Sequence, residues 1–100
     1  MRPLDRLKEK VQKGNLWLYI LSLLEKKSYY GYEMRGIIKT EFGFWIGNVT
    51  SYKVLYLLEK DGYVKSVKRG REIYYKITEK GHKELKAANK FLKTALGFSA

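Results

Sequence analysis

At Tyr63 the hydrophobic pattern of this chain changes its period, and few folds accommodate such a change. Before Tyr63, apolar side chains recur three and four positions apart, as they do along one face of a helix. From Tyr63 to Ile77 they alternate instead, in the β-rich runs YVKSVK and REIYYKI, which Arg69 and Gly70 separate. Since 100 residues suffice for one domain, we predict a single, mostly helical α+β domain with a two-stranded β-hairpin.

Helical spacing outside the hairpin predicts five helices. The run LWLYILSLL is apolar nearly all round, as expected of a central core helix. Its period also permits a strand, but a segment of about 12 residues favours a helix. We expect Asn15, Asn48 and Thr78 to be N-caps, and Gly62 to follow the C-cap of the fourth helix. The expected helices span residues 1–13, 15–27, 28–42, 48–61 and 78–96.

The charge of the chain points to a polyanionic partner. There are 21 Lys and Arg against 10 Asp and Glu, which gives a net charge of +11. Residues 48–78 hold +4 of this excess, and the hairpin tip concentrates Lys68, Arg69 and Arg71. Such a patch favours nucleic acid, with a merely solvated basic surface as the alternative.

What the chain lacks excludes most enzymes. It has no Cys, its only histidine is His82, and no glycine-rich phosphate loop occurs. We therefore expect no catalytic residues, no metal and no cofactor. The N-terminus is charged rather than apolar, and no apolar run approaches the 20 or so residues of a membrane span. These features predict a cytoplasmic protein without a membrane partner.

The start of the fourth expected helix is short, polar and capable of hydrogen bonding. We assign Thr50, Ser51 and Lys53 to its outward face, with Tyr52 and Tyr56 as further candidates, opposite the apolar Leu55. Such side chains suit a helix that enters a DNA groove, because they can pair with phosphates and base edges. An ordinary solvated helix start is the alternative.

Several short motifs follow one another in a characteristic order along the chain. They are LWLYILSLL, Tyr30-Gly31-Tyr32-Glu33, Thr50-Ser51-Tyr52, Leu55, Leu58-Glu59, Gly62, Arg71, Tyr74-Tyr75, Thr78 and Gly81. Together, residues 15–85 resemble the PadR family of winged-helix transcriptional regulators. The chain departs from that family at Val49, where a small residue is usual, at Lys53, where Pro is usual, and at Gly47, where a Ser N-cap is common.

The resemblance implies a winged helix-turn-helix core over residues 15–77, flanked by a 1–13 helix and a 78–97 dimerisation helix. The implied function is that of a sequence-specific regulator, a repressor, which binds a palindromic operator in double-stranded DNA as a homodimer. We assign DNA contacts to Tyr32, Asn48, Thr50, Ser51, Tyr52, Lys53, Lys68, Arg69 and Arg71. Core packing is an equal alternative for Tyr32 and Tyr52. An architectural protein that binds DNA without sequence preference, and a winged helix that binds protein, are the alternative functions.

Two terminal helices carry apolar stripes that call for a partner. Leu85, Ala88, Leu92 and Ala95 follow a 3-4-3 spacing, independently of any resemblance. The family implies that this helix packs across a two-fold axis. The residues assigned to the dimer interface are Leu4, Leu7, Val11, Leu85, Ala88, Phe91, Leu92, Ala95 and Leu96.

Some relatives bind planar aromatic effectors between their subunits. In this chain Trp17, Trp45 and Phe91 are the candidates to line such a pocket. Ordinary core packing is the more common role of aromatic residues at helical spacing.

Overall fold

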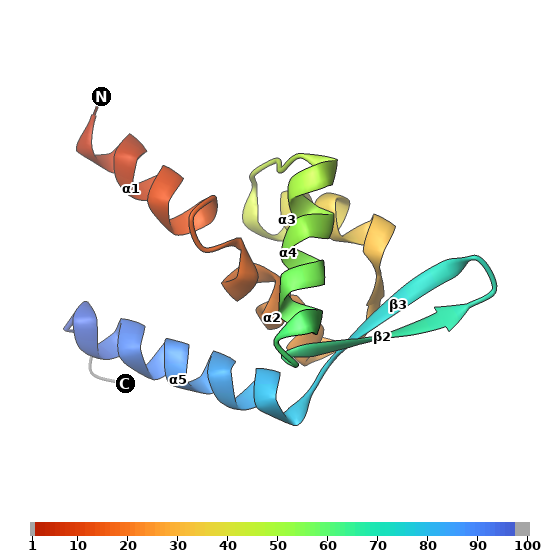
Figure 1. Cartoon of the computed structure of the whole chain (residues 1–100). Helices are drawn as coiled ribbons and strands as arrows, with labels where there is room; N and C mark the ends of the chain where they lie inside the picture. The colour runs from red at the N-terminus through yellow and green to blue at the C-terminus, as the bar shows by residue number, and fades with distance from the viewer. Residues whose placement is uncertain (1, 98–100) are drawn as a thin grey trace.

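Five α-helices and a small antiparallel sheet make up the computed structural model, which describes residues 2–97 (Figure 1). Met1, the first residue of the expected N-terminal helix, lies outside this range. The elements are α1 (Pro3–Gln12), α2 (Leu16–Lys26), β1 (Tyr29–Tyr30), the 3₁₀ turn η1 (Gly31–Glu33), α3 (Met34–Phe42), α4 (Asn48–Lys60), β2 (Val64–Arg69), β3 (Glu72–Ile77) and α5 (Glu79–Ala95). The predicted α+β winged-helix fold is confirmed.

Helix α2 lies at the centre of the core, as its apolar run predicts. Ile20 and Leu21 are completely buried, and α2 contacts α3, α4, β3 and α5. Met34, Ile38 and Leu55 reach it from α3 and α4. The run is therefore a helix and not a strand.

The sheet has one more strand than the sequence analysis expects. Tyr29 pairs with Tyr75, so that β1 lies beside β3 and the strand order is β1-β3-β2. The third helix, expected over residues 28–42, consequently starts only at Met34. Gly31 separates strand from helix in a tight space, where an added Cβ would lie 3.0 Å from the Tyr52 ring and 3.1 Å from the Tyr75 ring.

The hairpin formed by β2 and β3, called the wing below, turns one residue later than expected. Arg69 is part of β2 and pairs with Glu72. Gly70 and Arg71 form the turn, in which Gly70 has a φ of 62°. Glycine adopts this left-handed conformation without the steric cost that a Cβ brings.

Thr78 at the start of α5 and Gly62 after the end of α4 take the capping positions expected of them, and the two residues are hydrogen-bonded to each other. Thr78 caps α5, and its hydroxyl oxygen accepts a hydrogen bond from the Gly81 N–H at 3.1 Å. The same hydroxyl donates to the carbonyl of Gly62 at 2.6 Å. Gly62 follows α4 with a φ of 82°, as expected of the residue after a C-cap.

Of the two expected asparagine caps, Asn15 stands at the N-cap of α2 as expected, whereas Asn48 is not an N-cap. Gly47 is the N-cap of α4, and Asn48 is already its first helical residue. Asn15 does precede α2, but its side chain makes no cap hydrogen bond there. Instead, its amide donates to the carbonyl of Lys10 at 2.9 Å and so satisfies the end of α1.

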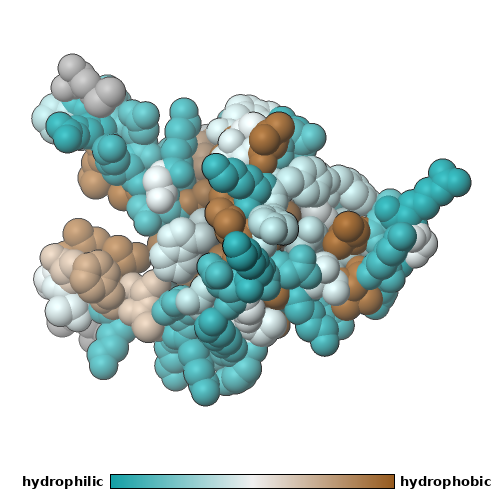
Figure 2. Space-filling view, in the orientation of Figure 1, coloured by the Kyte–Doolittle hydropathy of each residue, from teal (hydrophilic) through white to brown (hydrophobic). Residues whose placement is uncertain are grey.

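Helices α1 and α5 extend from the same side of the core as two arms (Figure 1). Figure 2 shows apolar surface on the sides of the arms that face one another, with polar surface outside. The exposed apolar residues of the arms include Leu4, Leu7, Val11, Phe91, Leu92 and Leu96. Leu85, by contrast, is 5% exposed and packs in the core of its own chain, so its assignment to a subunit interface is corrected.

Candidate nucleic-acid interface

The exposed face of α4 differs from the expected one in two residues: Ser51 is absent from it, and Val49 is present. Thr50, Tyr52 and Lys53 are exposed, as expected, together with Asn48. Ser51 is completely buried, and within the described residues its hydroxyl has no hydrogen-bond partner. Ser51 precedes Leu55 by four residues and therefore shares its inward stripe. Ser51 is thus withdrawn from the candidate DNA contacts.

Val49 is the residue that the sequence analysis missed on this face. Its side chain is 82% exposed, the largest value among the exposed large hydrophobic residues. Val49, Lys53 and Tyr56 are spaced four and three apart, so they line one side of the helix. Counting helical turns from the buried Leu55 would have placed Val49 outside and Ser51 inside.

The wing carries exposed cations beyond the body of the protein. Lys68, Arg69 and Arg71 are all exposed, and in Figure 2 the projecting tip is strongly hydrophilic. The Arg69 guanidinium lies 4.9 Å from the centre of the Tyr74 ring, which is the geometry of a cation–π contact. The guanidinium of Arg69 therefore lies beside the Tyr74 ring of the neighbouring strand while the residue stays exposed to solvent.

A cluster of three tyrosines connects the wing to the turn before α3. Tyr74 meets Tyr30 edge to face at 4.7 Å between ring centres, and Tyr30 stacks on Tyr32 at 5.6 Å. Aromatic pairs in these geometries attract one another beyond the area that they bury. Tyr32, at the outer end, is 60% exposed.

The hydroxyl of Tyr32 keeps its proton over a wide pH range. Loss of solvation, followed by the carboxylates of Glu72 and Glu33, raises the pKa of the Tyr32 phenol above its ordinary value. A protonated phenol can donate a hydrogen bond to a phosphate oxygen. The start of α3 thus offers a donor beside the wing.

Tyr52 combines the two roles that the sequence left open. One edge of its ring packs against Gly31, while 41% of the residue stays exposed. It therefore belongs to the contact between α4 and η1 and still presents surface to a ligand. The aromatic body suits the packing role, and the hydroxyl suits a polar contact.

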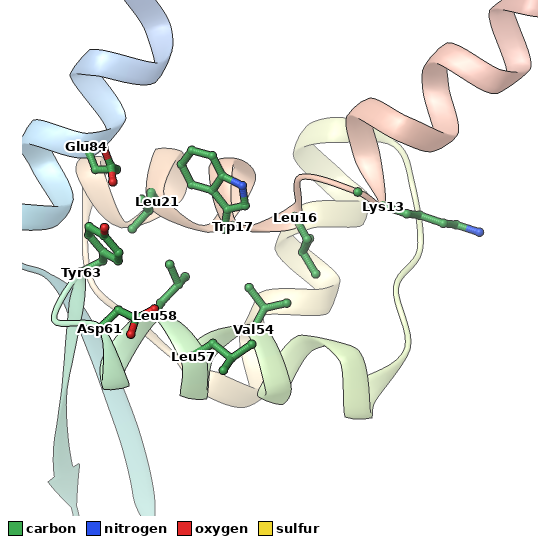
Figure 3. A pocket seen from close by; sticks show the side chains of 11 residues that line it. Lys13, Leu16, Trp17, Leu21, Val54, Leu57, Leu58, Asp61, Tyr63 and Glu84 are labelled. Carbon is green, nitrogen blue, oxygen red and sulfur yellow. The ribbon is translucent and has the colours of Figure 1, made fainter.

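The three aromatic residues assigned to an effector pocket are not brought together within one chain. Trp17 lines an apolar pocket of about 340 Å³ between α2, α4 and the start of α5, with Leu21, Leu58 and Tyr63 (Figure 3). Trp45 borders a separate hollow and is 61% exposed. Phe91 lines neither of these two hollows.

Acidic side chains also reach the pocket at Trp17. Asp61 and Glu84 are among its lining residues, from the end of α4 and from α5 (Figure 3). An apolar pocket with an indole wall and two carboxylates offers both stacking and a counter-charge.

Within residues 2–97, every helix is too short or too polar to cross a lipid bilayer. In the same part of the chain, no three His, Asp or Glu residues are grouped so that they could hold a metal ion.

A helix with an exposed polar start, followed by a cationic hairpin, defines a winged-helix protein of the DNA-binding type. The family model of PadR-like transcriptional regulators matches residues 20–87. The chain therefore belongs to the PadR-like family of transcriptional regulators. Members of this family are DNA-binding regulators rather than enzymes, which confirms the coarse functional prediction.

Solved structures of similar proteins agree with this assignment. A transcriptional regulator from Clostridium thermocellum is 33% identical, with a TM-score of 0.79 over 87% of this chain and 88% of its own. A PadR family regulator from Clostridium difficile is 26% identical, with a TM-score of 0.70 over 81% and 93%. One from Eggerthella lenta, at 21% identity, 0.77 TM-score and coverage of 94% and 86%, is similar in fold. The comparison with curated proteins gives no match.

Proposed function

We propose that the chain binds a palindromic operator as a homodimer and represses transcription there. The observation that carries this proposal is the combination of an exposed α4 face with two unpartnered apolar arms in one small domain. A two-fold dimer presents two copies of α4 to one side of a duplex. Their half-sites then lie about one helical turn, roughly 34 Å, apart and are inverted repeats.

In this proposal α4 enters the major groove. Asn48, Thr50 and Lys53 contact base edges, because their exposed side chains carry the donors and acceptors that the groove distinguishes. Tyr32 and Tyr52 donate hydrogen bonds to phosphates and fix the register of the protein on the duplex.

The wing supplies attraction that does not depend on sequence. Lys68, Arg69 and Arg71 lie along a phosphate backbone and release counterions on binding. If the dimer makes about 6 to 10 phosphate contacts, its affinity falls roughly 10³- to 10⁵-fold between 50 and 200 mM salt. A flat salt response would contradict the proposed role of the wing.

The arms form the dimer interface in this proposal. Phe91 on α5 is 69% exposed, Leu96 at the C-cap of this helix is 65% exposed, and Leu7 on α1 is 58% exposed. Contiguous apolar surface of this kind is unfavourable in water unless a partner covers it. The interface residues are those assigned above except the buried Leu85, namely Leu4, Leu7, Val11, Ala88, Phe91, Leu92, Ala95 and Leu96.

Repression follows from occupancy. A dimer that covers two half-sites blocks about two turns of duplex, and within a promoter this stretch is closed to polymerase. Selection of bound duplexes from a random pool tests the proposal directly. Enrichment of one inverted repeat is expected, whereas a pool with no enriched sequence would favour an architectural protein.

The two carboxylates beside the apolar pocket at Trp17 favour a second element of the proposal, an effector. We infer that a planar aromatic cation stacks on Trp17 and pairs with Asp61 and Glu84. Such a compound is expected to quench tryptophan fluorescence in the native protein and much less in Trp17→Phe. Because Trp45 borders a separate hollow, quenching that persists in Trp17→Phe would contradict this site.

A further inference from the structure

The first turn of α4 carries an exposed apolar side chain among polar ones. Val49 is 82% exposed, and its neighbours Asn48, Thr50 and Lys53 are exposed and polar. Val49 takes no part in the buried core or in the apolar shell around it. Gly47, the N-cap, has no side chain that could cover it.

Val49 also lies at the middle of the outward face. Ser51, Leu55 and Leu58 are the buried residues of α4. Val49 precedes Lys53 by four residues and Tyr56 by seven, so these three form the stripe opposite the buried one. Val49 is therefore part of the face that α4 presents to a ligand.

An apolar side chain at that place has one natural complement in duplex DNA. The base edges of the major groove present hydrogen-bond donors and acceptors, and the only apolar group among them is the C5-methyl group of thymine. On the basis of the proposed function, we propose that Val49 contacts a thymine methyl group and selects thymine at one position of each half-site.

The contact also gives a reason for an exposed apolar residue among the polar residues of this surface. In the free protein, its methyl groups face water, which is unfavourable. In the complex, they and the thymine methyl exclude water from each other. The gain is that of burying about one methyl group, which corresponds to roughly a four-fold change in affinity for each half-site.

Exchange of thymine for uracil tests this inference, since uracil keeps every hydrogen-bonding atom and lacks only the methyl group. The operator obtained by selection is synthesised with deoxyuridine at each thymine position in turn, symmetrically in both half-sites. We expect one position at which the wild-type protein loses about four-fold in affinity per half-site. Val49→Ser is expected to bind the two forms of that operator within about two-fold of each other.

Lys53→Ala is the matched control on the same face. It is expected to bind more weakly to both forms while it keeps the preference for thymine over uracil at the position read by Val49. Circular dichroism verifies that Val49→Ser is folded, as its exposed position predicts.

The outcomes separate this inference from the proposed function. A selection that enriches no sequence would overturn the proposed function itself. An enriched operator in which no uracil substitution weakens wild-type binding overturns the role of Val49 alone. The same holds if the loss is equal in wild type and Val49→Ser.

Discussion

The carboxylate of Glu59 accepts hydrogen bonds from both the backbone N–H and the hydroxyl of Ser66, the former at 3.1 Å. Glu59 is in the last turn of α4, and Ser66 is in β2. One side chain therefore connects α4 to the wing, the two elements that are proposed to contact DNA. We expect the angle between them to depend on this connection.

Loss of the Glu59 carboxylate is expected to weaken both fold and binding. Glu59→Ala leaves the half-buried N–H of Ser66 without its partner, which costs about 1–3 kcal/mol of the free energy of unfolding. Urea unfolding measures this cost. Operator affinity falls as well, because the wing is no longer fixed relative to α4.

Ser66→Ala is the control for Glu59→Ala. It removes the hydroxyl bond and keeps the N–H bond, so the loss of stability is expected to be smaller than that in Glu59→Ala. Equal stability of wild type and Glu59→Ala would refute the proposed connection.

Replacement of glycine by alanine is expected to have opposite effects on stability at two positions. Gly81 lies where a Cβ would clash with the Tyr63 carbonyl and approach the Ile77 side chain to 2.8 Å, so Gly81→Ala is expected to cost about 3 kcal/mol or more. Around Gly36, within α3, no atom other than those of its chain neighbours and of its own helix backbone lies within 4 Å of the place that a methyl group would take. Gly36→Ala is therefore expected to stabilise the protein by about 0.5–1 kcal/mol. Thermal unfolding of both variants checks the pair, and a stable Gly81→Ala would contradict the close packing at this glycine.

Removal of a wing cation is expected to change the salt dependence of binding without changing sequence preference. For Arg69→Ala, the slope of log affinity against log salt concentration decreases by about 1 for each phosphate that the wing no longer neutralises. Titrations at several salt concentrations give the slope. Lys83→Ala removes the same charge from the exposed side of α5 and is expected to keep the wild-type slope. If the slope decreases equally in the two variants, it reflects the total charge of the protein and not a contact of the wing.

A charge on the apolar side of α5 is expected to separate the subunits. Phe91→Asp would bury a carboxylate in the proposed interface, and a buried unpaired charge is strongly unfavourable. Light scattering is expected to give a monomer, with weak operator binding. Lys90→Asp is the control and should remain dimeric, because no residue of the apolar side lies three or four positions from the exposed Lys90, which is therefore on the other side of α5. A dimeric Phe91→Asp would place the interface elsewhere.

The stability of the protein is expected to decrease in alkali, partly through Tyr75. Burial, reinforced by Glu59 and Tyr52, raises the pKa of the Tyr75 phenol above its ordinary value. The folded state thus holds this proton more tightly than the unfolded state does. The resulting stability is complete below the unfolded pKa of about 10 and is lost as pH rises through the folded pKa.

Tyr75→Phe has no phenol to titrate at this position. Its free energy of unfolding, measured by urea between about pH 9 and 11.5, should fall less steeply than that of the wild type. Because the lysines titrate in both proteins, the difference between the two curves isolates Tyr75. Identical slopes would contradict the assignment.

The elements that the sequence predicts well are those whose signals are local. The nine consecutive residues LWLYILSLL are enough to predict the core helix α2. Thr78 and Gly62 act within one or two turns of their own positions. The β1 strand is different, because Tyr29 and Tyr30 become a strand through pairing with Tyr75 and Tyr74 far along the chain. A pattern confined to residues 28–42 contains no trace of that partner.

The candidate site shows the same division. Lys68, Arg69 and Arg71 follow from composition, since lysine and arginine at a hairpin tip stay in water. Residue chemistry alone predicts an exposed Ser51 and a buried Val49, because serine is polar and valine is apolar. Helix geometry decides otherwise, since the spacing of Ser51 from Leu55 turns it inward.

The strand order β1-β3-β2 leaves β2 at the edge of the sheet. An unpaired edge is a template on which strands of other molecules can assemble, and cells tolerate such edges mainly when they are charged or short. Here Lys65 and Lys68 are exposed along that edge. The lysines thus disfavour pairing of a second wing with this edge, and we expect a variant made neutral there to aggregate more readily.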